Sequence, residues 1–396
     1  MKIDTLALPD SAINFLKSQG YEKLYPPQAD SVKFGLLDGK SILVSAPTAS
    51  GKTLIAMLAM LSYLSKNNGK VVYLSPLRAL AAEKFTEFKK LEKILIGKKI
   101  KIGISTGDFE HIEKNLENSN VLILTNEKMD SIIRHGAEWI EEIGLVISDE
   151  VHLIGDESRG PTLEMILTHL KLLDTKPQIV GLSATITNSD EIAKWLDCKL
   201  VKNDWRPVPL SEGVCDGGQV TMSDGKTFEV KPSLRGIPID LGVQCVQEGG
   251  QSLVFAATRV SSKSLATKAS DIISQFLQKK ELTVLEKTSK QILAENEHTE
   301  IVKTLAILVK KGVAFHHAGL NQKCREIVEK EFRNGNIKLL SSTPTLAAGV
   351  NLPARRVVIS NINRYNAKIG ANRPISILEY KQLCGRAGRP QYDDYG

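Results

Sequence analysis

The chain has 396 residues, of which 42% are hydrophobic and 24% charged, a composition typical of two or three globular domains. Its net charge of +7 permits nucleic-acid binding without proving it. The apolar run at 54–64 is too short to span a bilayer, no signal-peptide core follows the first residue, and the 5 cysteines form no Cys-x-x-Cys pair. We therefore expect a cytoplasmic protein with no membrane association, zinc site or disulfide framework.

The first half of the chain alternates between apolar strands and helical segments. A capped helix at 10–19 ends at Gly20, and a rigid Pro-Pro turn at 24–28 precedes a helix at 29–37. Strands are expected at 41–45, 71–75, 102–105, 121–124, 144–148 and 179–183. Further helices are expected at 54–63, 78–90 and 162–173. Apolar strands separated by helices predict a parallel sheet covered on both faces.

The second half changes this pattern and then resumes it. Prolines within 204–210 mark a linker, and 212–230 is interpreted as an antiparallel hairpin that turns at 223–225. Beyond it, strands are expected at 252–256, 313–316, 337–341 and 357–360, and long helices at 262–280 and 287–311. We therefore predict two α/β domains, residues 1–203 and 204–396.

A phosphate-binding loop is predicted between the strand at 41–45 and the helix at 54–63. Backbone N–H groups of such a loop surround the phosphates, and the helix N-terminus adds partial positive charge. Lys52 would reach the β- and γ-phosphates, and Thr53 would ligate Mg²⁺. A chance Gly-Lys-Thr turn is the alternative. The expected nucleotide-binding residues of the loop are Ala46, Pro47, Thr48, Ala49, Ser50, Gly51, Lys52 and Thr53.

Two adjacent carboxylates follow the strand at 144–148. Asp149 would hold Mg²⁺ through water, and Glu150 would act as the general base for the attacking water. A solvated acidic loop is the alternative, but the preceding phosphate loop argues against it. Ser183 and Thr185 close another strand, where their hydroxyls would sense the γ-phosphate. A helix N-cap explains either hydroxyl equally well.

Gln382, Arg386 and Arg389 form a second catalytic candidate near the end of the sequence. The two arginines lie three positions apart, so a helical turn would place both on one side. Two guanidinium groups match the oxygens of a γ-phosphate in geometry and charge, and would stabilise the transition state. Gln382 would orient water or a phosphate. A basic surface turn is the alternative.

In this order across two α/β domains, these motifs resemble those of superfamily-two helicases. The Asp-Glu-Val-His box at 149–152, His-His-Ala-Gly-Leu at 316–320 and Gln-Leu-Cys-Gly-Arg-Ala-Gly-Arg at 382–389 resemble the Ski-type branch. Within that branch, the sequences at 24–28 and 46–53 are most similar to the archaeal Hjm/HelQ DNA helicases.

The resemblance implies two tandem RecA-like domains that hold ATP and Mg²⁺ between them, with Gln28 reading adenine and His152 coupling hydrolysis to movement. It also implies 3′-to-5′ movement on single-stranded or forked DNA, in replication-fork repair and recombination. Relatives of this kind continue into winged-helix and ratchet domains, so we interpret the sequence as a shortened motor core. We expect a monomer, and the sequence identifies no recombination or replication protein as a partner.

Strand-contact residues are implied in both domains. Region 355–389 holds 8 basic residues against 1 acidic residue, a field that attracts phosphates. Residues 361–375 predict either a strand-separating hairpin or an ordinary surface loop, with Tyr365 as a base-stacking candidate. The expected DNA-binding residues are Arg78, Thr106, Gly107, Arg259, His317, Gly319, Thr343, Thr345, Arg364, Tyr365 and Lys368.

Two other functions stay open. The core motifs do not separate a DNA helicase from an RNA helicase of the same branch, because backbone contacts dominate both. The other alternative is a nucleic-acid clamp that binds ATP with little turnover, against which the intact set of Lys52, Asp149, Glu150, Arg386 and Arg389 argues.

Overall fold

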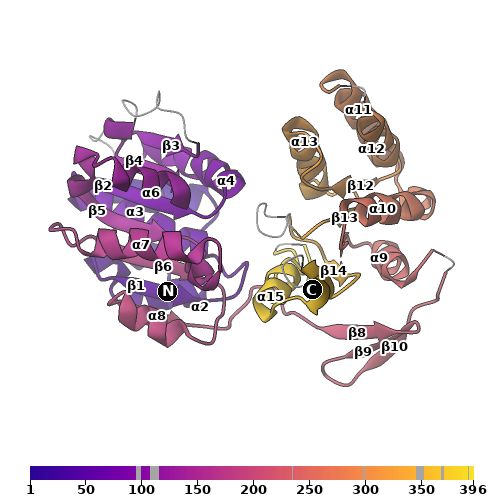
Figure 1. Cartoon of the computed structure of the whole chain (residues 1–396), viewed down its shortest axis with the longest axis horizontal. Coiled ribbons are helices and arrows are strands. Elements are labelled where there is room, and N and C mark those ends of the chain that lie inside the picture. Colours follow the sequence, from indigo (N-terminus) through magenta and orange to yellow (C-terminus); the bar gives the residue numbers. More distant parts are fainter. Residues whose placement is uncertain are drawn as a thin grey trace. The chain divides into compact units, whose positions relative to one another are not determined.

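The computed structural model describes residues 1–94, 100–107, 116–233, 235–297, 299–344, 352–366, 370–390 and 392–396. The chain divides into two compact units, Met1–Arg206 and Pro207–Gly396 (Figure 1). The sequence predicts the boundary after residue 203, at the start of the same proline-containing segment. Among the residues described, no helix is both long and apolar enough to cross a membrane.

The first unit is a parallel sheet with helices on both faces (Figure 1). Its strands are β1 (Ile42–Ser45), β2 (Lys70–Ser75), β3 (Ile102–Ser105), β4 (Val121–Thr125), β5 (Ile143–Ser148), β6 (Gln178–Ser183) and β7 (Lys199–Lys202). Its helices are α1 (Asp10–Ser18), α2 (Pro26–Lys33), α3 (Lys52–Lys66), α4 (Arg78–Phe88), α6 (Asn126–Arg134), α7 (Gly160–Lys171) and α8 (Ser189–Trp195).

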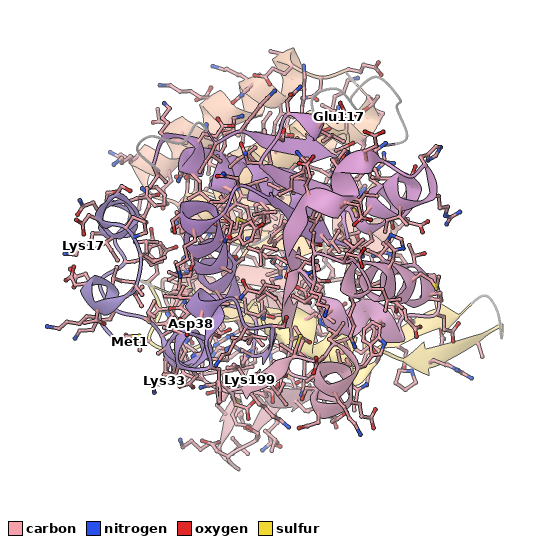
Figure 2. All side chains as sticks on the ribbon, turned by 90° about the vertical axis from the view of Figure 1, so that its left-hand side faces the viewer. Met1, Lys17, Lys33, Asp38, Glu117 and Lys199 are labelled. Atoms are coloured by element: carbon pink, nitrogen blue, oxygen red, sulfur yellow. The ribbon has the colours of Figure 1, made fainter. Side chains whose placement is uncertain are left out.

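All seven strands of this sheet pair in parallel, in the order β3-β4-β2-β5-β6-β1-β7. Because side chains alternate across a strand, each central strand supplies apolar groups to two cores. Tyr73 of β2 belongs to the core under α1–α4, whereas its neighbours Val72 and Leu74 belong to the core under α6–α8. Charged side chains such as Lys17 and Glu117 lie at the margin of the unit (Figure 2). Because helices cover both faces of the sheet, its central strands are apolar along their whole length.

The second unit combines a parallel sheet with two antiparallel pieces (Figure 1). Its strands are β8 (Gly213–Asp216), β9 (Gln219–Met222), β10 (Thr227–Glu229), β11 (Ser252–Phe255), β12 (Val313–His316), β13 (Leu339–Ser342), β14 (Arg356–Ile359), β15 (Asn363–Asn366) and β16 (Ala371–Pro374). Its helices are α9 (Ile237–Gln247), α10 (Arg259–Ile273), α11 (Lys279–Ala294), α12 (Glu300–Lys310), α13 (Gln322–Arg333) and α15 (Ile377–Cys384).

The main sheet of this unit has the order β12-β13-β11-β14, and all its pairs are parallel. Its strands share a core with α9–α13 and with Leu383 of α15. The α/β class predicted for both halves of the chain is thus confirmed.

Two expected elements of the second unit differ in the structure. The single hairpin predicted at 212–230 is a three-stranded antiparallel sheet, β10-β9-β8, because Gly217 and Gly218 add a second tight turn. The single helix predicted at 287–311 is two helices, α11 and α12. A break follows Ala294, and the Thr299 side chain accepts a hydrogen bond from the backbone N–H of Val302, which caps α12.

Candidate nucleotide site and strand-contact residues

The predicted phosphate loop joins β1 to α3. β1 lies between β6 and β7, so the start of the loop is fixed by hydrogen-bonded strands on both sides. Gly51 has φ +82°, and a Cβ at this position would lie 2.2 Å from Nε2 of Gln28. Both the left-handed backbone and the close approach require glycine here. The conformation therefore explains why this position lacks a side chain.

Gln28 ties α2 to the phosphate loop. The expected Pro-Pro turn is the first turn of α2, where proline fits because its missing N–H would be unpaired in any case. Gln28 is 2% exposed; its Oε1 accepts a hydrogen bond from the Tyr25 backbone N–H at 2.8 Å, and its Nε2 donates to the Gly51 carbonyl at 3.1 Å. The role in reading adenine stays a prediction.

Lys52 begins α3 and points back over the loop. Its Nζ donates to the carbonyl oxygens of Ala46 at 2.8 Å and Pro47 at 3.0 Å. Burial lowers the pKa of Lys52, while Glu150 and Asp149 act in the opposite direction. The lysine, the loop and both carboxylates thus share one electrostatic neighbourhood.

Asp149 and Glu150 lie directly after β5, as the sequence predicts. Oδ2 of Asp149 accepts the Tyr73 hydroxyl at 2.6 Å, and Oδ1 accepts the backbone N–H of Glu150 at 3.0 Å. Burial and the adjacent Glu150 raise the pKa of Asp149, whereas Lys84 opposes them. Glu150 has φ +51°, a backbone conformation that residues other than glycine rarely adopt and that occurs often at functional sites.

His152 connects Glu150 to the end of β6. Its Nε2 lies 3.2 Å from Oε2 of Glu150, and its Nδ1 accepts the backbone N–H of Ala184 at 3.2 Å. Burial, then Lys52, lowers the pKa of His152 to about 4, against the opposing effect of Asp149. A neutral ring with its hydrogen on Nε2 therefore orients the Glu150 carboxylate.

Of the expected coupling hydroxyls, the structure places one against this histidine. Oγ of Ser183 lies 3.4 Å from Nδ1 of His152 and donates to the Ala184 carbonyl at 2.8 Å. The hydroxyls of Thr185 and Ser50 are buried without a hydrogen-bond partner among the described residues. Buried hydroxyls of this kind are suited to a polar ligand.

These groups fit ATP and a divalent cation. Lys52 and the loop backbone could donate to phosphate oxygens, and the Thr53 hydroxyl and the Asp149 carboxylate could supply oxygen ligands for Mg²⁺. Within the described residues, no group of three or more His, Cys, Asp or Glu side chains could hold a metal ion.

In the first unit, the residues expected to contact DNA follow the ends of β-strands. Arg78 is exposed at the first position of α4, just beyond β2. Thr106 and Gly107 are half-buried just beyond β3. Because β2, β4 and β3 are parallel neighbours, these positions lie at the same edge of the sheet.

In the second unit, the structure brings Arg259, His317 and Gly319 together. The backbone N–H of Gly319 donates to Nδ1 of His317 at 3.1 Å, and a Cβ on Gly319 would lie 3.5 Å from Nη1 of Arg259. His316 instead pairs with Glu329, with 2.9 Å between Nε2 and Oε1. Thr343 follows β13 and donates its backbone N–H to the His316 carbonyl at 3.2 Å.

Of the two alternatives expected for 361–375, the structure shows the hairpin, because β15 and β16 pair antiparallel. Its role in separating DNA strands stays a prediction. Arg364 lies opposite Arg373, and Tyr365 opposite Asn372. The expected DNA-binding residues Thr345 and Lys368 lie outside the described residues. Base stacking by Tyr365 stays a prediction.

The arginine motif departs from the expected helical turn. α15 carries Gln382 but ends at Cys384, so Arg386 and Arg389 lie in the turns that follow. Gly388 has φ +83°, which a helix cannot accommodate. The backbone of this segment pairs instead with Ala354, whose N–H donates to Arg386 and whose carbonyl accepts from Gly388.

Arg389 is held within its own unit by residues that the sequence analysis missed. Its Nε and Nη2 each donate to the Asp393 carboxylate at 2.7 Å, and its Nη1 donates to Oε1 of Gln251 at 2.5 Å. The Asp393 side chain is only 3% exposed. The i, i+4 spacing of Arg389 and Asp393 was a signal that could have indicated the pair.

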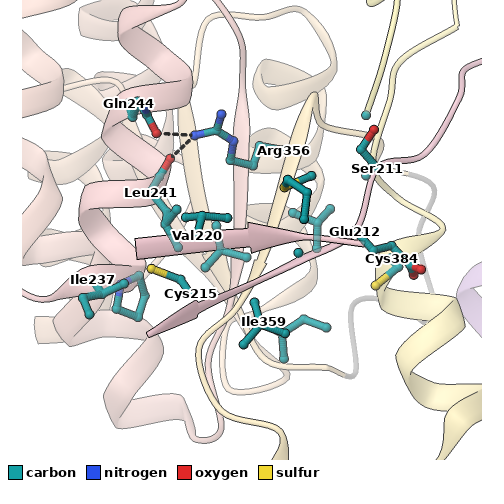
Figure 3. A pocket seen from close by; sticks show the side chains of 18 of the residues that line it. Ser211, Glu212, Cys215, Val220, Ile237, Leu241, Gln244, Arg356, Ile359 and Cys384 are labelled. Carbon is teal, nitrogen blue, oxygen red and sulfur yellow. Dashed lines mark hydrogen bonds between the residues drawn. The ribbon is translucent and has the colours of Figure 1, made fainter. Parts of the chain in front are cut away.

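The second unit also contains a cavity of about 980 Å³ between β8–β9 and the α9–β14 side (Figure 3). Arg356 crosses toward α9, where its Nη1 donates to the Leu241 carbonyl at 2.9 Å and to Oε1 of Gln244 at 3.1 Å. None of the predicted site residues belongs to the described lining of this cavity.

Comparisons with known proteins match both halves of the chain. Residues 25–192 match the DEAD/DEAH box helicase family, and residues 268–391 match the helicase conserved C-terminal domain. Across its whole length, the chain is 45% identical to the ATP-dependent DNA helicase Hel308 of Methanocella arvoryzae, 44% to that of Pyrococcus horikoshii and 41% to that of Pyrobaculum calidifontis. It spans 53%, 53% and 54% of these relatives, or about half their length. The expected helicase resemblance and the two RecA-like domains are confirmed.

Proposed function

The chain belongs to the superfamily-two helicases, and from this premise we propose that it is an ATP-dependent motor core that moves along single-stranded DNA. The observation that carries the proposal is the arrangement of Lys52, Asp149, Glu150 and His152 at the ends of β1 and β5. This arrangement brings together hydrogen-bond donors for phosphate oxygens, ligands for a metal ion and an oriented general base.

Each residue of the first unit has a defined task in the proposal. Mg²⁺, when bound, would supply positive charge to the β- and γ-phosphate oxygens. Lys52 exchanges its two carbonyl partners for phosphate oxygens. Glu150 accepts a proton from the attacking water, and neutral His152 holds that carboxylate in place through its Nε2–H.

His152 also offers a route from hydrolysis to movement. Its Nδ1 is bonded to the backbone of Ala184, beside Ser183 and Thr185. We propose that these residues report the state of the γ-phosphate to the rest of the unit. The catalytic roles of Gln382, Arg386 and Arg389, and the DNA contacts, are part of the proposal.

The direct test is ATP turnover of this chain with single-stranded DNA and with RNA of matched length and base composition. We expect DNA to stimulate turnover more than RNA. Stronger stimulation by RNA would contradict the DNA assignment and favour an RNA helicase of the same branch. No stimulation by either would favour an ATP-binding clamp.

The relatives are ATP-dependent DNA helicases, and the finer features of the proposal extend this similarity to the archaeal Hjm/HelQ type. We propose 3′-to-5′ polarity, action on forked DNA during repair and recombination, and a monomer. Unwinding of fluorescent forks with a 3′ or a 5′ single-stranded tail tests the polarity, and only the 3′-tailed fork should be opened. The cytoplasmic location stays a prediction.

A further inference from the structure

A second buried lysine of the first unit lies on α4. This helix buries Ala81, Lys84 and Phe88, which the 3.6-residue period places on one face. Lys84 is 8% exposed. Lysine is rarely buried unless its charge is paired, so its partners indicate its purpose.

Those partners include the phosphate loop. Nζ of Lys84 donates to Oγ1 of Thr53 at 2.7 Å and to Oε2 of Glu87 at 2.9 Å, and lies 4.0 Å from Oε1 of Glu83. The carboxylates of Glu87 and Glu83 place negative charge beside the Lys84 ammonium group. Lys84 is thus an ammonium ion on the hydroxyl proposed to ligate Mg²⁺.

α4 reaches the same site at a second point. The ring of Phe88 packs edge-on against Tyr73, with 5.4 Å between centroids, and the Tyr73 hydroxyl donates to Asp149. One helix therefore contacts both proposed metal ligands, Thr53 directly and Asp149 through Tyr73. The same helix begins with the exposed Arg78.

A hydroxyl that ligates a divalent cation must turn a lone pair toward the metal. An ammonium has only donors and needs a lone pair of the same oxygen. Two cations on one oxygen also repel each other strongly where little water screens them. A hydroxyl has two lone pairs, but this repulsion makes the Lys84 contact and a metal contact at Thr53 compete with each other.

We propose that Lys84 competes with the divalent cation for Thr53, and that cation–nucleotide binding displaces Lys84 from Thr53, leaves it paired with Glu87 beside Glu83, and shifts α4 with its DNA-contact candidate Arg78. The inference deepens the proposed function and rests on it. Lys84 is a positioning residue that makes nucleotide affinity and DNA affinity depend on each other. The dependence is reciprocal, as linkage requires.

The test is a Lys84→Met variant, which keeps an apolar stem of similar length and removes the charge. Binding of a fluorescent, non-hydrolysable ATP analogue is titrated with Mg²⁺, and single-stranded DNA affinity is measured with and without Mg²⁺ and the analogue. In Lys84→Met we expect half-saturation at about tenfold lower Mg²⁺, within the usual range of coupling. The effect of the analogue on DNA affinity should be lost.

Two further variants keep the test interpretable. Lys89→Met removes a lysine that lies just beyond α4 and pairs with Glu92 at 2.7 Å, and should leave both titrations unchanged. Glu87→Gln weakens the carboxylate contact that Lys84 would keep after leaving Thr53, and should therefore raise the Mg²⁺ requirement. If Lys84→Met fails to fold, Glu87→Gln decides the inference by itself.

The outcomes separate the inference from the proposed function. If the unaltered chain does not bind the analogue, the proposed function fails and the inference with it. If the chain binds the analogue but Lys84→Met needs as much Mg²⁺ or more, only the inference fails. An unchanged Mg²⁺ requirement in Glu87→Gln also overturns it.

Discussion

The phosphate loop of the first unit and the arginine motif of the second each hold a cationic side chain, but with partners of different strength. Lys52 donates to two neutral carbonyl groups, and burial lowers its pKa. Arg389 donates twice to a buried carboxylate and once to an amide. A cation held by neutral acceptors transfers more readily to an anionic ligand than one in a bidentate ion pair. Lys52 is thus more readily available to an anionic ligand, whereas Arg389 has a structural role beside the catalytic one proposed for it.

The largest expected effect is on turnover at the loop. Lys52→Ala should lower ATP turnover by at least about a hundredfold, because it removes a preorganised cation from the phosphates. Its thermal unfolding should stay close to that of the unaltered chain, since among the described residues Lys52 hydrogen-bonds to carbonyls of its own loop. Steady-state ATP hydrolysis and a melting curve check both points. A large loss of stability would break the contrast between the regions.

The opposite balance is expected in the arginine motif. Arg389→Ala removes the guanidinium from the Asp393 carboxylate, which keeps only the backbone N–H of residue 389 as a hydrogen-bond donor from that position, and should cost about 3 kcal/mol of unfolding free energy. Urea unfolding measures this cost. The double variant Arg389→Ala/Asp393→Ala should recover part of it. An Arg389→Ala protein that unfolds like the unaltered chain yet has lost turnover would show that the arginine serves catalysis alone.

His152 should make the free energy of unfolding depend on pH. Its pKa in the folded chain is about 4, against an ordinary 6.5, so the unfolded chain binds a proton that the folded chain does not between these values. Stability should therefore fall by about 3 kcal/mol as pH drops from 6.5 to 4, with no further loss from this group below that range. Comparing urea unfolding of the chain and of His152→Gln across this range isolates the contribution. Identical slopes in the two proteins would contradict it.

The smallest expected effect is at Gly51. Gly51→Ala places a methyl group against Gln28 and strains a left-handed backbone, which should cost about 1–3 kcal/mol. In the double variant with Gln28→Ala, the steric part should disappear and the backbone part should remain. Melting curves of the three variants separate the two causes. Full recovery in the double variant would mean that the backbone carries no strain.

The sequence predicted the parts of the fold whose signal is local. Strands buried on both faces are apolar throughout, so β1, β2 and β4–β6 are recognisable from composition. β7 was missed because it lies at the sheet edge and exposes its lysines. The Gly217-Gly218 turn was missed because the strand before it, β8, is only four residues long. The break between α11 and α12 has no proline or glycine to mark it.

In the candidate site, too, only residues with a local sequence signal could be predicted. Residues that act through their own chemistry, such as Lys52 and the Asp149–Glu150 pair, carry a local motif. Lys84 and Asp393 matter through partners, and Lys84 meets Thr53 only because α4 and α3 cover the same face of the sheet. No spacing in the sequence brings those two residues together. The roles of Lys84 and Asp393 are visible only in the three-dimensional structure.

ATP turnover by the unaltered chain and by Glu150→Gln, with saturating single-stranded DNA, tests the central claim most directly. The amide keeps the shape of the side chain but cannot accept the proton of the attacking water. We expect DNA-stimulated turnover in the unaltered chain, a loss of at least about a hundredfold in the variant, and unchanged binding of a non-hydrolysable ATP analogue. Equal, near-zero rates in the two proteins would contradict a motor and leave an ATP-binding clamp.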